Sequence, residues 1–90
     1  MGTLQKIQQR ISGRDYFLSS HAEEEMLDDG LERPDIESAI LKGRIEKRLT
    51  NDSRGTRYRI EGPARDGRLI HVVCRFHEIT NLLVITVYAL

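Results

Sequence analysis

The hydrophobic period of the chain changes about halfway along its length. In residues 3–43, apolar side chains recur at intervals of three and four, as in Leu4, Ile7 and Ile11. This spacing predicts three helices, at about residues 3–13, 20–30 and 34–43, each ending near a glycine. From residue 45 onward the period is two, which predicts strands at about 45–50, 56–62, 68–76 and 82–88.

The order of these elements predicts the fold class. Helices followed by strands with short turns favour an α+β domain, in which two to three N-terminal helices pack on one face of a four-stranded antiparallel sheet. Ninety residues correspond to a single domain, 1–90, with helices in about 3–42 and the sheet in about 44–89. The sequence has no apolar run long enough to cross a membrane, no leader-like N-terminus and one cysteine, so we expect a cytoplasmic protein without a membrane partner.

Alternation within the strands separates two faces of the expected sheet. One face is apolar and is expected to lie under the helices: Tyr58, Ile60, Ile70, Val72, Cys74 and Phe76. In the last strand we assign Leu83, Ile85 and Val87 to the same core. The opposite face then carries the charged and protic groups Arg57, Arg59, His71, Arg75, Thr86 and Tyr88. Val84 is expected to point to the same side.

Imidazole, phenol and guanidinium groups on one face suit phosphoryl transfer. Histidine and tyrosine transfer protons, and arginines stabilise charge that develops on a phosphorus centre. A metal-free ribonuclease needs a base for the 2′-hydroxyl, an acid for the leaving oxygen and cations around the phosphate. The alternative is a solvated sheet face of mixed charge, and the residues alone leave both interpretations open.

The net charge of zero hides a division along the chain. Residues 1–41 contain four Lys or Arg and nine Asp or Glu, whereas residues 42–75 contain ten and four. This asymmetry indicates contact with a polyanion or a charged partner, or else two halves that neutralise each other.

Two residues outside this face also bear on chemistry. His21 either hydrogen-bonds locally in the first turn of its helix or reaches the polar sheet face. His21 and Glu25 have a spacing found in metal sites, but two ligands do not make a site, and we expect no metal and no cofactor. Cys74 falls on the apolar face, where we expect a core residue and not a nucleophile.

Several segments together resemble one bacterial family. They are Ser20-His21-Ala22-Glu23-Glu24-Glu25-Met26, Asp29-Gly30-Leu31, the stretch 35–46 with Gly43, Asp52-x-Arg54-Gly55, Gly62, Asp66-Gly67-Arg68, His71-Val72-Val73 and Ile85-Thr86-Val87-Tyr88. Over residues 4–88 the chain resembles the family catalogued as domain of unknown function 4258 (DUF4258), whose members look like relatives of the RelE and BrnT toxins.

The resemblance implies a RelE-like fold and the toxin component of a bacterial toxin–antitoxin system, a metal-independent endoribonuclease acting on mRNA. It also implies two partners: RNA, free or on the ribosome, and a cognate antitoxin of zinc-ribbon or helix-turn-helix type. The neutral charge departs from strongly basic ribosome-dependent toxins. The alternative is a non-catalytic protein-interaction module, whose acidic helices or open sheet edge bind an antitoxin-like partner.

The candidate residues combine the resemblance with the argument from the sheet face. His21, Arg54, His71 and Tyr88 match recurrent polar positions of the family. The candidate catalytic residues are His71, Arg75, Tyr88, Arg57 and His21. The candidate RNA-binding residues are Arg54, Arg57, Arg59 and Arg68.

Overall fold

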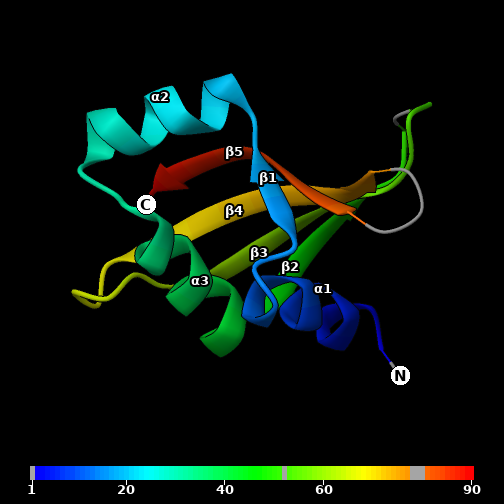
Figure 1. The fold of residues 1–90 in the computed structure, drawn as a ribbon, viewed down its shortest axis with the longest axis horizontal. Coiled ribbons are helices and arrows are strands. Elements are labelled where there is room, and N and C mark those ends of the chain that lie inside the picture. Colours follow the sequence, from blue (N-terminus) through cyan, green and yellow to red (C-terminus); the bar gives the residue numbers. More distant parts are fainter. Residues whose placement is uncertain (1, 52, 78–80) are drawn as a thin grey trace.

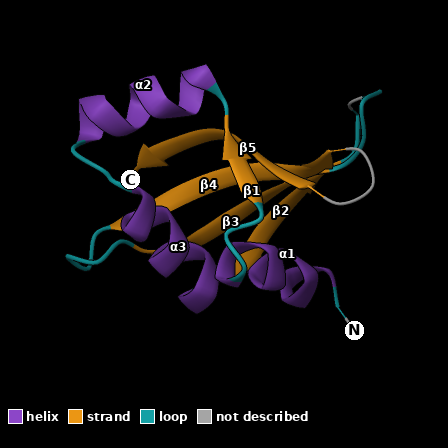
Figure 2. Cartoon of the chain, viewed as in Figure 1, coloured by secondary structure: helices purple, strands orange, loops and turns teal. Residues whose placement is uncertain are grey.

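The computed structural model describes residues 2–51, 53–77 and 81–90. Its elements run α1 (Thr3–Ser12), β1 (Tyr16–Leu18), α2 (Ser20–Asp29), α3 (Arg33–Lys42), β2 (Arg44–Leu49), β3 (Arg57–Pro63), β4 (Leu69–His77) and β5 (Asn81–Ala89) (Figures 1 and 2). Each helix has ten residues, and in the described part of the chain none is long and apolar enough to cross a bilayer. The turn expected between the last two strands lies partly outside the described residues.

The strands form one sheet in the order β1-β5-β4-β3-β2. β1 pairs with β5 in parallel, and the other neighbours are antiparallel. The predicted α+β class is therefore confirmed, but the sheet is mixed and has five strands, not four antiparallel ones. β1 escaped prediction because three residues are too few to show an alternating pattern.

The core lies between the sheet and the helices α1 and α3, which cross the same face (Figure 1). Ile7 of α1 and Ile36 of α3 are fully buried there, as is Ile60 of β3. α3 approaches β3 so closely that a Cβ atom added at Gly62 would overlap the carbonyl group of Ala39. This glycine is therefore required by helix–sheet packing.

The expected core of the last strand is wrong in part. The fully buried residues of β5 are Leu82, Val84 and Val87, whereas Leu83 and Ile85 are only partly buried. The β4–β5 register shifts because β5 contains one extra residue there, a β-bulge that reverses the alternation. Val84 therefore faces the core, not the polar face to which the sequence assigned it.

α2 lies along the outer edge of β5, beyond the end of β1 (Figure 1). The carboxylate of Glu25 accepts a hydrogen bond from Val87 N at 3.0 Å, and that of Asp29 accepts one from Ala89 N at 3.1 Å. Two acidic side chains of the helix thus satisfy backbone N–H groups that a neighbouring strand would otherwise bind. Part of the acidic character of the N-terminal half therefore has a structural role.

Candidate active site

A row of polar side chains crosses the outer face, which is the face of the sheet turned away from α1 and α3. Glu61 of β3, His71 of β4 and Tyr88 of β5 are register partners on neighbouring strands. His71 is only 8% exposed, although the sequence suggested an open surface. The long side chains beside it bury the imidazole.

Both ring nitrogens of His71 have partners. Nε2 lies 3.0 Å from Oε1 of Glu61, and Nδ1 lies 3.0 Å from the hydroxyl oxygen of Tyr88. An ionised carboxylate can only accept, so Nε2 carries a hydrogen and donates it to Glu61. In the neutral imidazole Nδ1 is then the acceptor, and the Tyr88 hydroxyl donates to it.

Two ion pairs flank this Glu61–His71–Tyr88 chain. Arg44 Nη2 lies 3.3 Å from the second carboxylate oxygen of Glu61. Arg59 holds Glu46 through two nitrogens, Nε at 2.6 Å and Nη2 at 3.2 Å. This pairing lowers the pKa of Glu46 and raises that of Arg59, to which the Tyr88 hydroxyl adds a smaller upward contribution. Arg59 is the register partner of Val73, which lies two residues from His71 on the same face, so its guanidinium group lies near the His71–Tyr88 pair.

This arrangement can move a proton. If an external group gives a proton to the Tyr88 oxygen while the Tyr88 proton passes to His71 Nδ1, the imidazole becomes a cation beside Glu61. The carboxylate stabilises that cation, as it does in other carboxylate–histidine pairs. Tyr88 is partly exposed and His71 is buried, so the phenol is the end of the chain that a substrate meets.

The predicted catalytic residues do not all meet at one point. Arg57 and Arg75 lie on the outer face, but near the other end of the sheet. His71 and Arg75 are four positions apart on β4, a span of roughly 13 Å along a strand. The guanidinium group near His71 and Tyr88 is that of Arg59.

His21 is tied to the outer face only indirectly. Its Nε2 lies 3.3 Å from a carboxylate oxygen of Glu25. Glu25 also accepts hydrogen bonds from the Thr86 hydroxyl and from Val87 N. The structure thus places His21 in a local interaction at the β5 edge, with its side chain about two-thirds exposed.

The predicted RNA-binding arginines are spread over both ends of the sheet. Arg54 lies in the β2–β3 connection, on the side of Arg57. Arg68 lies in the β3–β4 turn at the opposite end, where it bonds to the Asp66 carboxylate and to the Asp29 carbonyl oxygen. Arg68 is therefore occupied in holding the turn against α2.

The carboxylates of the site were not predicted from the sequence. Glu61, Glu46 and Arg44 complete the network around His71 and Arg59, and none was a candidate. The sequence contains only a weak indication of this role: Glu61 alternates in phase with Arg57 and Arg59, which places it on the same face. Only the cross-strand register shows that Glu61 faces His71.

The described residues do not offer a metal site or a reactive thiol. No group of three or more His, Cys, Asp or Glu in the described ranges is placed to hold a metal ion. Cys74 is buried in the core, and burial raises the pKa of its thiol to about 12. The thiolate, which is the nucleophilic form, is therefore disfavoured.

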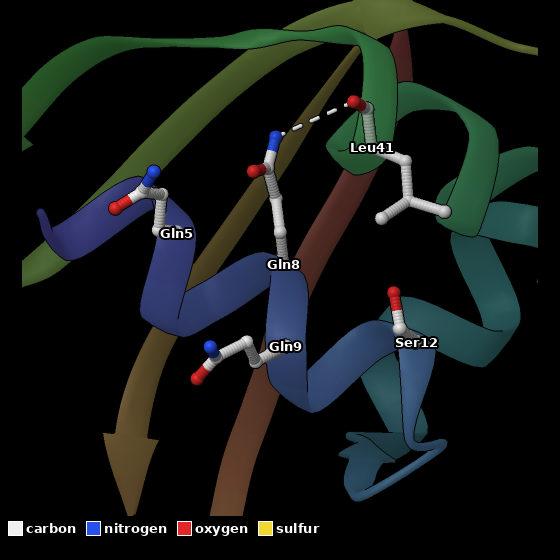
Figure 3. Close-up of a pocket in the computed structure, with 5 residues that line it drawn as sticks. All are labelled: Gln5, Gln8, Gln9, Ser12 and Leu41. Carbon is white, nitrogen blue, oxygen red and sulfur yellow. Dashed lines mark hydrogen bonds between the residues drawn. The ribbon is translucent and has the colours of Figure 1, made fainter. Parts of the chain in front are cut away.

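A polar groove lies away from the outer face, between α1 and the end of α3. Gln5, Gln8, Gln9, Ser12 and Leu41 line it (Figure 3). The side-chain amide of Gln8 donates to the carbonyl oxygens of Ile40 at 3.2 Å and Leu41 at 3.3 Å. Gln8 thus caps the C-terminus of α3, and the groove contains no group that titrates near neutral pH.

Fold and site define a small α+β domain with a buried histidine between a carboxylate and a phenol on its sheet. A family model described as Domain of unknown function (DUF4258) matches residues 18–89. The chain belongs to this family, and the match includes Glu61, His71 and Tyr88 but not α1. Comparison with curated proteins and with solved structures gives no significant match.

Proposed function

We propose that this protein is a metal-independent endoribonuclease, the toxin component of a bacterial toxin–antitoxin system that cleaves mRNA in the cytoplasm. The observation that supports this most is the chain Glu61–His71–Tyr88, which ends in a hydroxyl group beside the guanidinium of Arg59. A phosphodiester needs a proton acceptor and a cation at the same place, and this pair supplies both.

The proposed reaction is attack by the 2′-hydroxyl of RNA on the adjacent phosphorus. The 2′-hydroxyl proton passes to the Tyr88 oxygen as the Tyr88 proton passes to His71 Nδ1. The bond between the 2′-oxygen and phosphorus forms, and the bond between phosphorus and the 5′-oxygen breaks. The Tyr88–His71 pair then returns the proton to the 5′-oxygen, which leaves as a hydroxyl, and the other product is a 2′,3′-cyclic phosphate.

Charged side chains around Tyr88 and His71 stabilise the charges that form in both stages of this reaction. Glu61 stabilises the imidazolium, and Arg44 holds Glu61 in place at 3.3 Å. Arg59 lies near Tyr88, and we expect the N–H groups that do not bond to Glu46 to donate to the non-bridging phosphate oxygens.

Cleavage of RNA by purified protein in the presence of a chelator tests this proposal. We expect the parent to cleave and Tyr88→Phe, which removes one hydroxyl, to be slower by on the order of 100-fold or more. Tyr58→Phe is the matched control: Tyr58 lies on the core side of the sheet, and we expect it to keep the parent rate. Intact RNA with the parent, both with and without ribosomes, contradicts the proposal.

The cellular role has a test of its own. We expect induced expression of the parent to arrest growth and expression of Tyr88→Phe to arrest it far less. An antitoxin that covers the outer face should relieve the arrest. Normal growth during expression of folded parent protein contradicts the toxin role, even if RNA is cleaved in vitro.

A non-catalytic interaction module is a second candidate, supported by the position of β2 at the end of the sheet. β2 presents an edge to which an extended segment of a partner can add, and three of its six residues are basic: Arg44, Lys47 and Arg48. Under this function, His71→Ala leaves biological activity intact.

Charge reversal tests the acidic helix as the alternative contact surface. Glu25 and Asp29 are unsuitable because they bond to β5, so the reversal is confined to Glu23, Glu24 and Asp28. If the triple variant keeps its melting temperature but no longer binds the antitoxin-like partner, the result supports the interaction module. Unchanged binding argues against a contact through α2.

A further inference from the structure

The outer face holds a second cluster, at the end of the sheet away from His71. Phe17 of β1 is the register partner of Leu83 of β5, and Leu83 is the partner of Arg75 of β4. Partners side by side in a sheet share a face, so an aromatic ring, an aliphatic side chain and a guanidinium group form one row. The side chain of Phe17 is 56% exposed.

The charge of this row complements an anion. Arg75 makes no ion pair with any residue that the structure describes, in contrast to Arg59 and Arg44. Arg57 stands on the same face in the next strand, at the same end of the sheet. An exposed aromatic ring on the same sheet face as guanidinium groups is a combination that binds single-stranded nucleic acid, where bases stack and phosphates pair with arginines.

The distance between this cluster and the proposed active site fits a short stretch of nucleic acid. On β5, Tyr88 lies five residues from Leu83 across the bulge, roughly 13 Å along the strand, and Phe17 lies one strand, about 5 Å, beyond Leu83. A nucleotide has twice as many backbone bonds as an amino-acid residue, so about two extended nucleotides span this distance. A strand whose scissile phosphate meets Arg59 and Tyr88 therefore extends to Phe17.

We propose that Phe17 is a stacking platform for a base of single-stranded RNA, about two nucleotides from the cleaved bond, with Arg75 bound to an intervening phosphate. The proposal rests on the function proposed above and specifies its substrate as unpaired RNA. A base within a duplex is covered on both faces by its neighbours and cannot stack on Phe17. Phe17 directly precedes the part of the chain matched by the family model.

Steady-state cleavage of a short unpaired RNA by Phe17 variants tests the platform. We expect Phe17→Ala to raise KM roughly 5- to 100-fold and to leave kcat nearly unchanged, because a stacked base contributes to binding and not to proton transfer. Phe17→Trp should retain the parent KM, and Phe17→Leu should resemble Phe17→Ala. Leu27→Ala is the matched surface control, since Leu27 is 82% exposed on α2, and should behave as the parent does.

Substrates that lack one base locate the contact. An abasic nucleotide is placed two positions from the cleaved bond, on the 5′ side in one substrate and on the 3′ side in another. With the parent, one of these substrates should show the same rise in KM as Phe17→Ala. With Phe17→Ala that substrate should show no further loss, because ring and base act as one pair.

Binding of a 2′-O-methyl version of the RNA, which cannot be cleaved, separates this inference from the proposed function. Binding that depends on an aromatic residue at position 17, without cleavage of normal RNA, retains the platform and refutes the nuclease. Cleavage with the same KM in the parent and Phe17→Ala refutes the platform and retains the nuclease. Absence of RNA binding by the folded parent refutes both.

Discussion

Replacement of Asp35 by asparagine should be among the most damaging conservative substitutions in this chain. Asp35 is buried at the start of α3 and accepts four contacts: Arg65 N and Nε, both at 3.0 Å, Arg65 Nη2 at 3.4 Å and Glu32 N at 2.8 Å. The carboxylate thereby joins the N-terminus of α3 to the β3–β4 turn, which precedes β4 and His71. Asparagine keeps the size of the side chain but removes the charge and one acceptor oxygen.

The pKa of Asp35 gives the size of the expected loss of stability in Asp35→Asn. The hydrogen bonds from Arg65 lower this pKa from 3.8 to about 2, against the opposing effect of burial. That difference corresponds to about 2 kcal/mol of stability at neutral pH. Because the Arg65 side chain is half exposed, we expect the loss in Asp35→Asn to stay near 2–3 kcal/mol and below the ~3–5 kcal/mol of a fully buried broken pair.

The pH dependence follows from the sign of the shift. A lowered carboxyl pKa contributes stability that is complete above the unfolded-state pKa near 4 and disappears as pH falls towards 2. Thermal unfolding followed by circular dichroism should show Asp35→Asn melting about 10–20 °C below the parent at pH 7. The gap should narrow between pH 4 and pH 2. Asp28→Asn is the control, since Asp28 is exposed on α2, and should shift the midpoint little.

Two results would show that the ionised carboxylate of Asp35 does not stabilise the fold. One is a melting temperature for Asp35→Asn equal to that of Asp28→Asn at pH 7. The other is a gap between parent and Asp35→Asn that stays constant down to pH 2, because the stabilisation would then not depend on ionisation of Asp35.

Three further predictions concern packing, the β5 edge and the thiol. Gly62→Ala should lower the free energy of unfolding in urea by about 3 kcal/mol or more, because α3 must move away from β3. Gly2→Ala is the control and should lower it little, since there is open space around Gly2. Equal losses in the two variants would contradict the close approach of α3 to β3. Glu25→Gln should lower the free energy of unfolding by about 1–2 kcal/mol, because its hydrogen bonds to β5 become weaker. A loss of stability no larger than that of Glu24→Gln, which changes an exposed glutamate, would argue against the contact of Glu25 with the β5 edge. Cys74 should resist iodoacetamide at pH 8 until the protein is unfolded, since burial raises its pKa to about 12; rapid labelling of native protein would contradict its burial.

Much of the fold was predictable because each long element repeats its own period. Ile7 and Ile11, or Ile70 and Val72, mark one face of a helix or strand without any tertiary information. The failures occur where no period exists. β1 is too short to alternate, and the extra residue Ile85 reverses the faces of β5 at a bulge that hydrophobicity does not mark.

The sequence predicted which face of the sheet the site residues occupy, but not which residues contact one another there. Alternation placed His71 and Arg59 on the outer face, and both lie there. That Glu61 meets His71 depends on the β3–β4 turn, where Ala64 N bonds to Arg68 O and Gly67 has φ +91°. That Tyr88 meets His71 depends on which strand lies beside β4. Short turns predicted that consecutive strands pair, but which residues meet across them is not encoded in a local pattern.

The most direct test of the account uses a DNA oligonucleotide that contains one ribonucleotide, incubated with the protein in chelator and followed by mass spectrometry. We expect the parent to cut only after the ribonucleotide and to leave a 2′,3′-cyclic phosphate, and we expect Tyr88→Phe to be slower by on the order of 100-fold or more. Cutting at deoxynucleotides, or cutting by Tyr88→Phe at the parent rate, would contradict the claim that Tyr88 and His71 remove the 2′-hydroxyl proton.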